Sequence, residues 1–150
     1  MFRPATSADT EALLGLMRGY YTDEGYPFAE AGARKALVEL LAVPTLGRVW
    51  IAHEAGAPIA YAVLTLGFSL EYAGRDAFLD DVYVAPRYRG RGLGRAALEA
   101  VEATCMELEV RALHLVVERY KTRAQALYRR AGFVDHDRYL MTKRFDGGQD

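Results

Sequence analysis

The chain has 150 residues, of which 51% are hydrophobic and 26% charged, the balance of an ordinary globular protein. This length predicts a single domain over residues 1–150. A net charge of −1 argues against nucleic acid as the main partner. A single cysteine excludes an internal disulfide framework. No apolar run approaches the ~18 residues of a membrane span, and the first ten residues hold no apolar signal region, so we expect a soluble, cytoplasmic protein.

Two helices are predicted near the beginning of the chain. Thr6 and Asp9 have the spacing of a capping box, in an Asp variant, and apolar residues follow them at helical spacing. Gly25 and Pro27 interrupt that pattern. A second helix is predicted over residues 28–41, with its apolar residues on one stripe.

From Arg48 onward, the pattern of apolar residues changes from one typical of helices to one typical of strands. Residues 48–54, 59–70 and 76–84 are rich in β-branched and aromatic side chains, and the turns "AGAP" and "EYAGR" separate them. The second segment is apolar at nearly every position, which is typical of a strand buried on both faces. These segments therefore predict an antiparallel meander.

The last third of the chain predicts a βαβ unit. A basic, glycine-rich turn at residues 89–94 precedes a helix whose apolar stripe includes Cys105. A strand over 112–117, a short helix over 122–132 and a final strand over 137–145 follow. The strand before the turn and the strand over 112–117 should be parallel. The expected fold class is mixed α/β: one twisted, mostly antiparallel sheet with helices on both faces.

The glycine-rich turn has the character of a phosphate-binding loop. A P-loop sequence is absent, and a dinucleotide fingerprint would need glycine where Arg95 stands. The spacing of Arg89, Gly92 and Gly94 fits a third pattern, a basic residue, two free positions, and then two glycines one residue apart. Without side chains, these glycines let backbone N–H groups of a helix start approach a pyrophosphate. The alternative is an ordinary strand-to-helix connection with solvated arginines.

That third pattern resembles the pyrophosphate loop of the GNAT superfamily of acetyl-CoA-dependent N-acetyltransferases. Residues 122–133 are similar to the family's second signature, in the expected order along the chain. The resemblance implies the acyl-CoA N-acyltransferase fold, acetyl-CoA as cosubstrate and no metal. It implies these cofactor-binding residues: Val82, Tyr83, Val84, Arg89, Gly90, Arg91, Gly92, Leu93, Gly94 and Arg95. Lys121 stands where the family often has Asn, and we expect it to meet a phosphate of coenzyme A.

The resemblance also implies direct attack by the acceptor amine on the thioester, in a ternary complex. Tyr128 matches the family's general acid; the alternative is a tyrosine that packs between helix and sheet. Residues 71–84 resemble the diamine-acetyltransferase branch, and there Asp80 is expected to draw the amine proton away through water. The alternative for Asp80 is a structural carboxylate at a strand end. Strand alternation predicts that Asp80 and Asp81 face opposite sides, and Cys105 is interpreted as core rather than nucleophile.

Acceptor selection is expected from two segments that combine carboxylates with aromatic rings. Glu24 and Tyr26 belong to the first, Glu71 and Tyr72 to the second, and such a combination suits a small cationic primary amine. The alternative is a solvated acidic surface. The three histidines lack metal-ligand spacing. Two rival functions are a non-catalytic acyl-CoA-binding or regulatory domain and a protein N-terminal or lysine acetyltransferase. A homodimer is expected only by analogy with the family.

Overall fold

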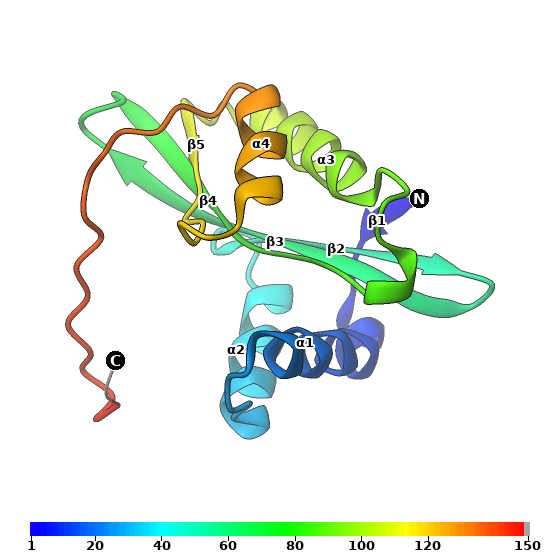
Figure 1. Ribbon diagram of the computed structural model, residues 1–150. Helices are drawn as coiled ribbons and strands as arrows, with labels where there is room; N and C mark the ends of the chain where they lie inside the picture. Colours follow the sequence, from blue (N-terminus) through cyan, green and yellow to red (C-terminus); the bar gives the residue numbers. More distant parts are fainter. Residues whose placement is uncertain (149–150) are drawn as a thin grey trace.

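The computed structural model describes residues 1–148 of the chain (Figure 1). Its strands are β1 (Phe2–Pro4), β2 (Gly47–Glu54), β3 (Ala57–Ser69), β4 (Gly74–Val84) and β5 (Ala112–His114). Its α-helices are α1 (Thr10–Glu24), α2 (Glu30–Ala42), α3 (Leu93–Glu107) and α4 (Thr122–Arg130). The strands of the described residues form one sheet in the order β1-β2-β3-β4-β5. This is the predicted fold class, a mixed and mostly antiparallel sheet with helices on both faces.

The predicted meander is confirmed. β2 and β3 pair antiparallel, and so do β3 and β4, so that β3 has a hydrogen-bonded neighbour along both edges. Residues 60–64 of β3 are buried, as expected for a strand covered on both faces.

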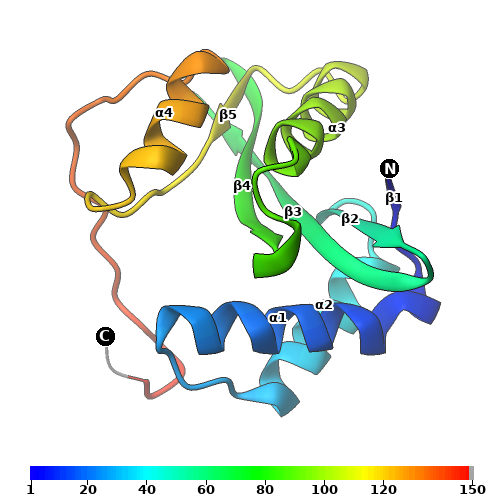
Figure 2. The same cartoon turned by 45° about the vertical axis from the view of Figure 1, so that its right-hand side comes forward.

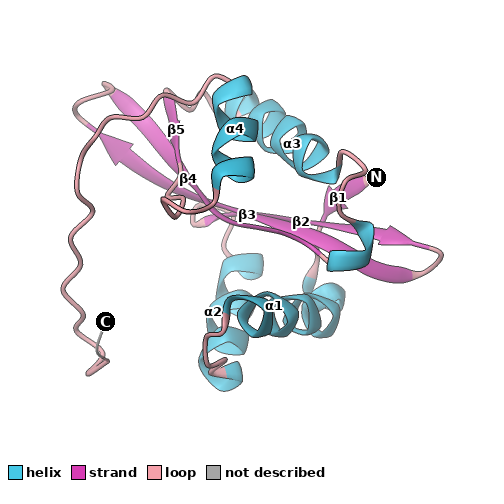
Figure 3. Cartoon of the chain, viewed as in Figure 1, coloured by secondary structure: helices cyan, strands magenta, loops and turns pink. Residues whose placement is uncertain are grey.

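Two helical layers enclose the sheet, as Figure 2 and Figure 3 show: α1 and α2 cover one face, and α3 and α4 the other. The first layer packs its apolar stripe on side chains such as Ile51, Tyr61 and Tyr83. Ala97 and Val101 of α3 pack on the opposite face. Alternate residues of one strand therefore serve two separate cores.

The predicted capping box also forms. The backbone N–H of Thr6 donates to the carboxylate of Asp9 at 2.8 Å. Arg3 donates two further hydrogen bonds to that carboxylate, at 2.7 and 2.8 Å. The hydrogen bonds from Arg3 and Thr6 hold the pKa of the buried Asp9 far below its usual value. The entry to α1 is thus fixed by a fully satisfied buried carboxylate.

The parallel pairing of β4 with β5 is confirmed, but the pairing is short. Asp76–Phe78 pair with Ala112–His114, and the ladder stops there although the apolar run continues to Val117. The two strands separate beyond Phe78. This separation creates the site described below.

The prediction of a final strand over residues 137–145 is wrong. Residues 134–148 are extended or bent, they join no ladder within the described chain, and every one of them is exposed. The apolar and aromatic residues of this segment suggested a strand, but a strand needs a partner edge, and this segment runs away from the sheet (Figure 1). Within residues 1–148, no helix combines the length and the apolar character needed to cross a bilayer.

Candidate functional site

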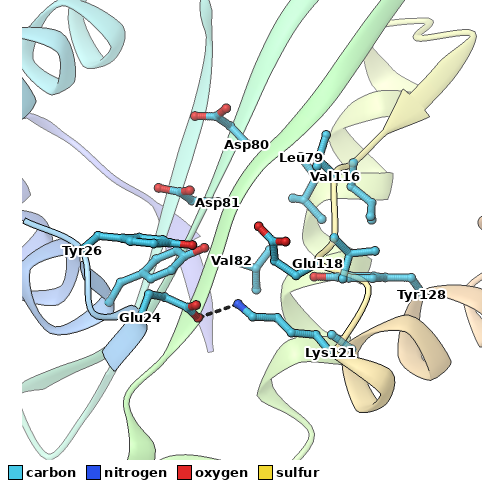
Figure 4. A pocket seen from close by; sticks show the side chains of 14 residues that line it. Glu24, Tyr26, Leu79, Asp80, Asp81, Val82, Val116, Glu118, Lys121 and Tyr128 are labelled. Carbon is cyan, nitrogen blue, oxygen red and sulfur yellow. Dashed lines mark hydrogen bonds and ion pairs between the residues drawn. The ribbon is translucent and has the colours of Figure 1, made fainter. Parts of the chain in front are cut away.

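A pocket opens where β4 and β5 separate (Figure 4). Residues 79–82 of β4 form one wall and residues 115–118 form the other, while α1 and α4 supply the remaining sides. The cavity measures about 210 Å³. At ~30 Å³ per water molecule this is room for the end of an extended chain rather than for one or two waters.

Both aspartates of β4 face this pocket, so the prediction that they face opposite sides is wrong. Val63 of β3 is opposite Asp81, and Leu64 is opposite Leu79, which leaves Asp80 as an extra residue in a β-bulge. A bulge interrupts the alternation of side chains along a strand. Figure 4 shows the two carboxylates projecting to the same side of β4, away from Leu79.

The bulge sets the exposed Asp80 carboxylate close to the partly buried carboxylate of Asp81. Burial and the charge of Asp80 raise the pKa of Asp81 to about 7, against the smaller effect of Tyr61. The Tyr61 hydroxyl donates to the Asp81 carboxylate at 3.2 Å. Asp80 is exposed, and partial desolvation of its carboxyl raises its pKa as well. Near neutral pH this pair can therefore accept a proton.

A cation-and-carboxylate contact crosses the mouth of the pocket. Lys121, directly before α4, donates to Glu24 at the end of α1, and its ammonium lies 6.0 Å from the centre of the Tyr20 ring. The structure therefore places Lys121 against Glu24, and its expected contact with a phosphate stays a prediction. Glu24 and Tyr26 both line the pocket, as Figure 4 shows. With Asp80, Asp81 and Glu118, the pocket carries more carboxylates than cations.

Tyr128 faces the pocket from α4, on the side opposite the aspartates. Its ring packs edge-on against Phe133, with centroids 5.8 Å apart. Burial raises the pKa of its phenol, so the hydroxyl keeps its proton at neutral pH. A protonated phenol held at a pocket wall can donate to a leaving group.

The glycine-rich turn leads into α3 from the end of β4 nearest α1. Gly90 and Gly92 have φ of +78° and +79°, the left-handed region that favours glycine, and Gly92 is the N-cap of α3. A β-carbon at either position would meet no atom within 4 Å, so the space above the turn is open. At Gly94 a β-carbon would lie 3.3 Å from Leu127 of α4. The turn thus offers the unpaired N–H groups of a helix start to an open surface.

The arginines of the turn are held by carboxylates around it. Arg89 donates to the Val84 carbonyl at 2.9 Å and to Asp23 at 3.1 Å. Arg91 pairs with Glu54, and Arg95 pairs with Glu99 one helical turn away. All three arginine side chains are more than half exposed, so an anionic ligand can reach them.

The backbone of β4 next to the turn has a free edge. Because the Val84 carbonyl accepts from Arg89, it points away from β3, and alternation places the N–H and carbonyl of Val82 on that same edge. Val82 also lines the pocket. The Tyr83 side chain lies on the face of the sheet that α1 and α2 cover, where its ring stacks on the Tyr20 ring with centroids 5.5 Å apart. An extended amide chain could pair with the Val82 edge.

Glu71 and Tyr72 lie outside the pocket. Both belong to the turn between β3 and β4, where Glu71 pairs with Arg138 at 3.1 Å. The Tyr72 ring contacts His114 with centroids 5.3 Å apart. The structure thus brings Glu24 and Tyr26 to Asp80, and leaves the second acidic-aromatic segment at the far end of the sheet.

Sequence reasoning missed Asp81 and Glu118 as pocket residues. The adjacent carboxylates of Asp80 and Asp81 were the visible signal, but the bulge that turns both inward depends on pairing with β3. Cys105 is buried in the α3 layer as predicted, and burial raises the pKa of its thiol to about 11. Among residues 1–148 no group of three or more His, Cys, Asp or Glu side chains is placed to hold a metal ion.

A parallel strand pair that opens beside a glycine-rich helix start is typical of transferases that use an acyl-coenzyme A donor. A sequence profile described as "Acetyltransferase (GNAT) family" matches residues 11–133. The chain belongs to this family.

Among curated proteins, an aminoglycoside N(6')-acetyltransferase type 1 of Stenotrophomonas maltophilia is 30% identical over 142 residues, covering 92% of this chain and 88% of that protein. A thialysine N-epsilon-acetyltransferase of Bos taurus is 31% identical over 77 residues. That match covers 51% of this chain and 45% of the bovine protein, so the chain spans about half the length of this relative.

Solved structures share the fold. An integron cassette protein from the mobile metagenome of Cole Harbour Salt Marsh is 39% identical, with a TM-score of 0.87 over 96% of this chain and 90% of that chain. A predicted acetyltransferase of Clostridium acetobutylicum, solved with acetyl-CoA, is 23% identical, with a TM-score of 0.81 and 95% of each chain covered. The latter similarity concerns the fold alone.

Proposed function

We propose that the protein transfers an acetyl group from acetyl-CoA to the primary amine of a small cationic molecule. The observation that carries this proposal is the pocket between β4 and β5, which has an acidic wall on one side and Tyr128 on the other. The aminoglycoside and thialysine acetyltransferases similar to this chain have names that point to amine acceptors, which supports the same class.

The open turn and the β4 edge fit the donor. Coenzyme A combines a pyrophosphate with an amide chain, and acetyl-CoA supplies the acetyl group as a reactive thioester. The N–H groups at the start of α3 and the exposed arginines Arg91 and Arg95 would hold the pyrophosphate. The free edge at Val82 would pair with the amide chain and direct its end into the pocket.

The acidic wall fits the acceptor. An alkyl amine with a pKa near 10.4 is protonated at neutral pH, so it enters an acidic pocket as a cation and must then lose a proton to attack. Glu24 would bind the ammonium in place of Lys121, and the Tyr26 ring beside it would add a cation-π contact. Asp80 and Asp81 would take the proton, through water for Asp80. Tyr128 would give its proton to the departing thiolate.

The test is steady-state release of coenzyme A from acetyl-CoA with a panel of diamines, amines that are uncharged at the assay pH, and lysine peptides. Diamines should give the highest kcat/KM. Release with none of them would favour a non-catalytic acyl-CoA-binding protein, and a preference for peptides would favour a protein acetyltransferase.

Two variants locate the acceptor. Glu24→Gln removes a contact made before the chemical step, so it should raise KM for a diamine while leaving kcat within a few-fold. Glu71→Gln is the matched control, because Glu71 lies outside the pocket. An equal effect of both variants would contradict the assignment of the acceptor to the α1 side.

Variants of the aspartates locate the proton acceptor. The kcat/KM of the wild type should rise with pH through a limb near 7, where Asp81 titrates. Asp81→Asn should lower kcat and flatten that limb, and Asp80→Asn, which removes a neighbouring negative charge, should displace the limb to lower pH. If Asp80→Asn leaves the profile unchanged, Asp80 is structural and the proton goes to Asp81.

A further inference from the structure

The ammonium group of Lys121 lies in surroundings of the kind that proteins use to bind organic cations. It donates to the carboxylate of Glu24 (Figure 4) and lies 6.0 Å from the centre of the Tyr20 ring. The hydroxyl of Tyr120 donates to the same carboxylate at 3.5 Å, and Tyr26 lines the pocket beside it. A carboxylate combined with aromatic rings attracts ammonium and quaternary ammonium groups. We call Glu24, Tyr20, Tyr26 and Tyr120 the ammonium cage, and Lys121 occupies it.

The pair of Lys121 and Glu24 is partly shielded from solvent. Their side chains are 31% and 19% exposed, whereas those of the helical pair Arg95 and Glu99 are 79% and 67% exposed. Burial lowers the pKa of Lys121, but the hydrogen bond to Glu24 and its charge raise the pKa by more, so the group is a cation at neutral pH. Removing one partner of a shielded pair leaves the other charge uncompensated. A molecule that displaces Lys121 must therefore supply a cation of its own.

The other charged side chains of the pocket are carboxylates. Asp80, Asp81 and Glu118 line it, and Lys121 is the one cationic side chain among the described residues that do so. Lys121 extends from the start of α4 across to Glu24 at the end of α1 (Figure 4). An acceptor that approaches the two aspartates thus meets the cage as a second place for a positive charge, and Lys121 already fills that place.

We propose that Lys121 is a specificity-determining residue that competes, from within the chain, with the acceptor for the ammonium cage; this inference rests on the proposed function. A monoamine bound at the aspartates leaves the contact between Lys121 and Glu24 in place. A diamine gains a contact for its second ammonium only by displacing Lys121, so its net gain is the difference between two similar contacts. Lys121 therefore narrows the preference of the enzyme for diamines over monoamines, and removal of its charge widens that preference.

Steady-state kinetics with a matched pair of acceptors tests this role. The pair is a diamine and the monoamine in which a methyl group replaces the second ammonium. Lys121→Met keeps the apolar stem of the side chain and removes its charge. If the cage is free about a tenth of the time in the wild type, vacating it should lower KM for the diamine about tenfold. KM for the monoamine should stay nearly the same.

Two further variants make the result specific to the cage. Lys35→Met removes a lysine charge on α2, outside the pocket lining, and should leave the ratio of the two KM values as in the wild type. In a Glu24→Gln background, Lys121→Met should no longer alter that ratio, because the carboxylate for which the two ammonium groups compete is gone. A Lys121→Met enzyme that raises KM for acetyl-CoA and affects both acceptors equally would overturn the inference, since that is the result expected if Lys121 binds a phosphate of coenzyme A.

Binding of tetramethylammonium probes the cage without turnover, because this cation has no N–H group and accepts no acetyl group. Titration calorimetry, against sodium chloride at equal ionic strength, should give a Kd for Lys121→Met about tenfold below that of the wild type, and Glu24→Gln should abolish the gain. Tighter binding without release of coenzyme A with any acceptor would support the cage and remove the proposed function. Turnover of amines with the same Kd in the wild type and in Lys121→Met would keep the proposed function and overturn the role of Lys121.

Discussion

The meander and the β4–β5 opening contain the same kinds of residue in different surroundings. In the meander, each strand of the β2–β3–β4 group is hydrogen-bonded along nearly its full length, and the carboxylate of Asp9 beside it has two cationic hydrogen bonds from Arg3. In the opening, β4 loses its neighbour beyond Phe78, and Asp81 has a phenol as its hydrogen-bond partner and a second carboxylate nearby. Strand edges and charges that already have partners stabilise the fold. Strand edges and charges that lack partners can instead gain interactions from a ligand.

The largest expected effect is on kcat, and it compares a tyrosine of the pocket with a tyrosine at the far end of the sheet. Tyr128→Phe keeps the ring against Phe133 and removes only the proton, so kcat should fall by about 10²–10⁴, the usual contribution of a positioned acid. Tyr72→Phe, at the far end of the sheet beside His114, should leave kcat unchanged. Steady-state kinetics with a diamine measures both. A Tyr128→Phe enzyme within a few-fold of the wild type would show that this tyrosine only packs.

Two glycines with the same backbone conformation give the next comparison. Gly92 begins α3 and Gly56 lies in the β2–β3 turn; their φ values are +79° and +80°, and both have open space around them. A valine at either place should cost a similar ~1–3 kcal/mol of strain. Acetyl-CoA at 100 times its Kd should stabilise the wild type by ~2.7 kcal/mol, a Tm increase of about 5–10 °C.

Only Gly92→Val should abolish that increase in Tm, because its side chain would occupy the space over the helix start. Gly56→Val should lower Tm yet retain the full increase on adding acetyl-CoA. Thermal melts with and without acetyl-CoA, and with ATP as an unrelated phosphate compound, measure the effect. An increase retained in Gly92→Val would remove the turn from the cofactor site.

The smallest effect, and the one with opposite signs in the two regions, concerns pH and stability. Burial raises the folded pKa of Asp81 to about 7, above the ~3.9 of an unfolded chain, so its ionisation destabilises the fold increasingly from about pH 4 to 7. Asp81→Asn keeps an oxygen acceptor for Tyr61 and should raise Tm by several degrees at pH 8, but not at pH 4.

Asp9 should behave in the opposite way. Its folded pKa is lowered by Arg3 and Thr6, so its contribution to stability is complete above the unfolded pKa and is lost as the pH falls through the lower folded value. Asp9→Asn should therefore lower Tm at pH 7, with a smaller difference in acid. Melts of both variants from pH 3 to 8 measure the two slopes. Slopes of the same sign would contradict the contrast between scaffold and site.

The sequence was sufficient where a feature depends on neighbouring residues along the chain. The capping box of Thr6 and Asp9, the apolar stripe of α3 and the glycine-rich turn before that helix are local patterns, and the structure confirms the elements that they predict. The antiparallel meander followed because its turns are short, and the parallel pairing followed from the handedness and length of a βαβ connection.

Features that depend on distant partners could not be predicted. The bulge at Asp80 exists only in the register between β3 and β4, and no local signal in residues 76–84 marks it. Glu71 and Tyr72 resembled an acceptor segment in composition, but the length of the β3–β4 hairpin carries them away from the pocket. Residues 137–145 have a strand composition, and whether they form a strand depends on which edge is available to them.

The end of α1 joins the two halves of the proposed site. Asp23 is held by Arg89 of the glycine-rich turn, and the adjacent Glu24 is held by Lys121 at the start of α4. The end of α1, which would bind the amine, is thus joined by ion pairs of two adjacent residues to the glycine-rich turn and to the start of α4, the two segments that would bind coenzyme A. Binding on one side cannot displace either cation without altering the carboxylate that faces the other. If the proposed function holds, the affinities for the two substrates should be coupled, and any factor by which one substrate changes the affinity for the other should apply equally in the reverse direction.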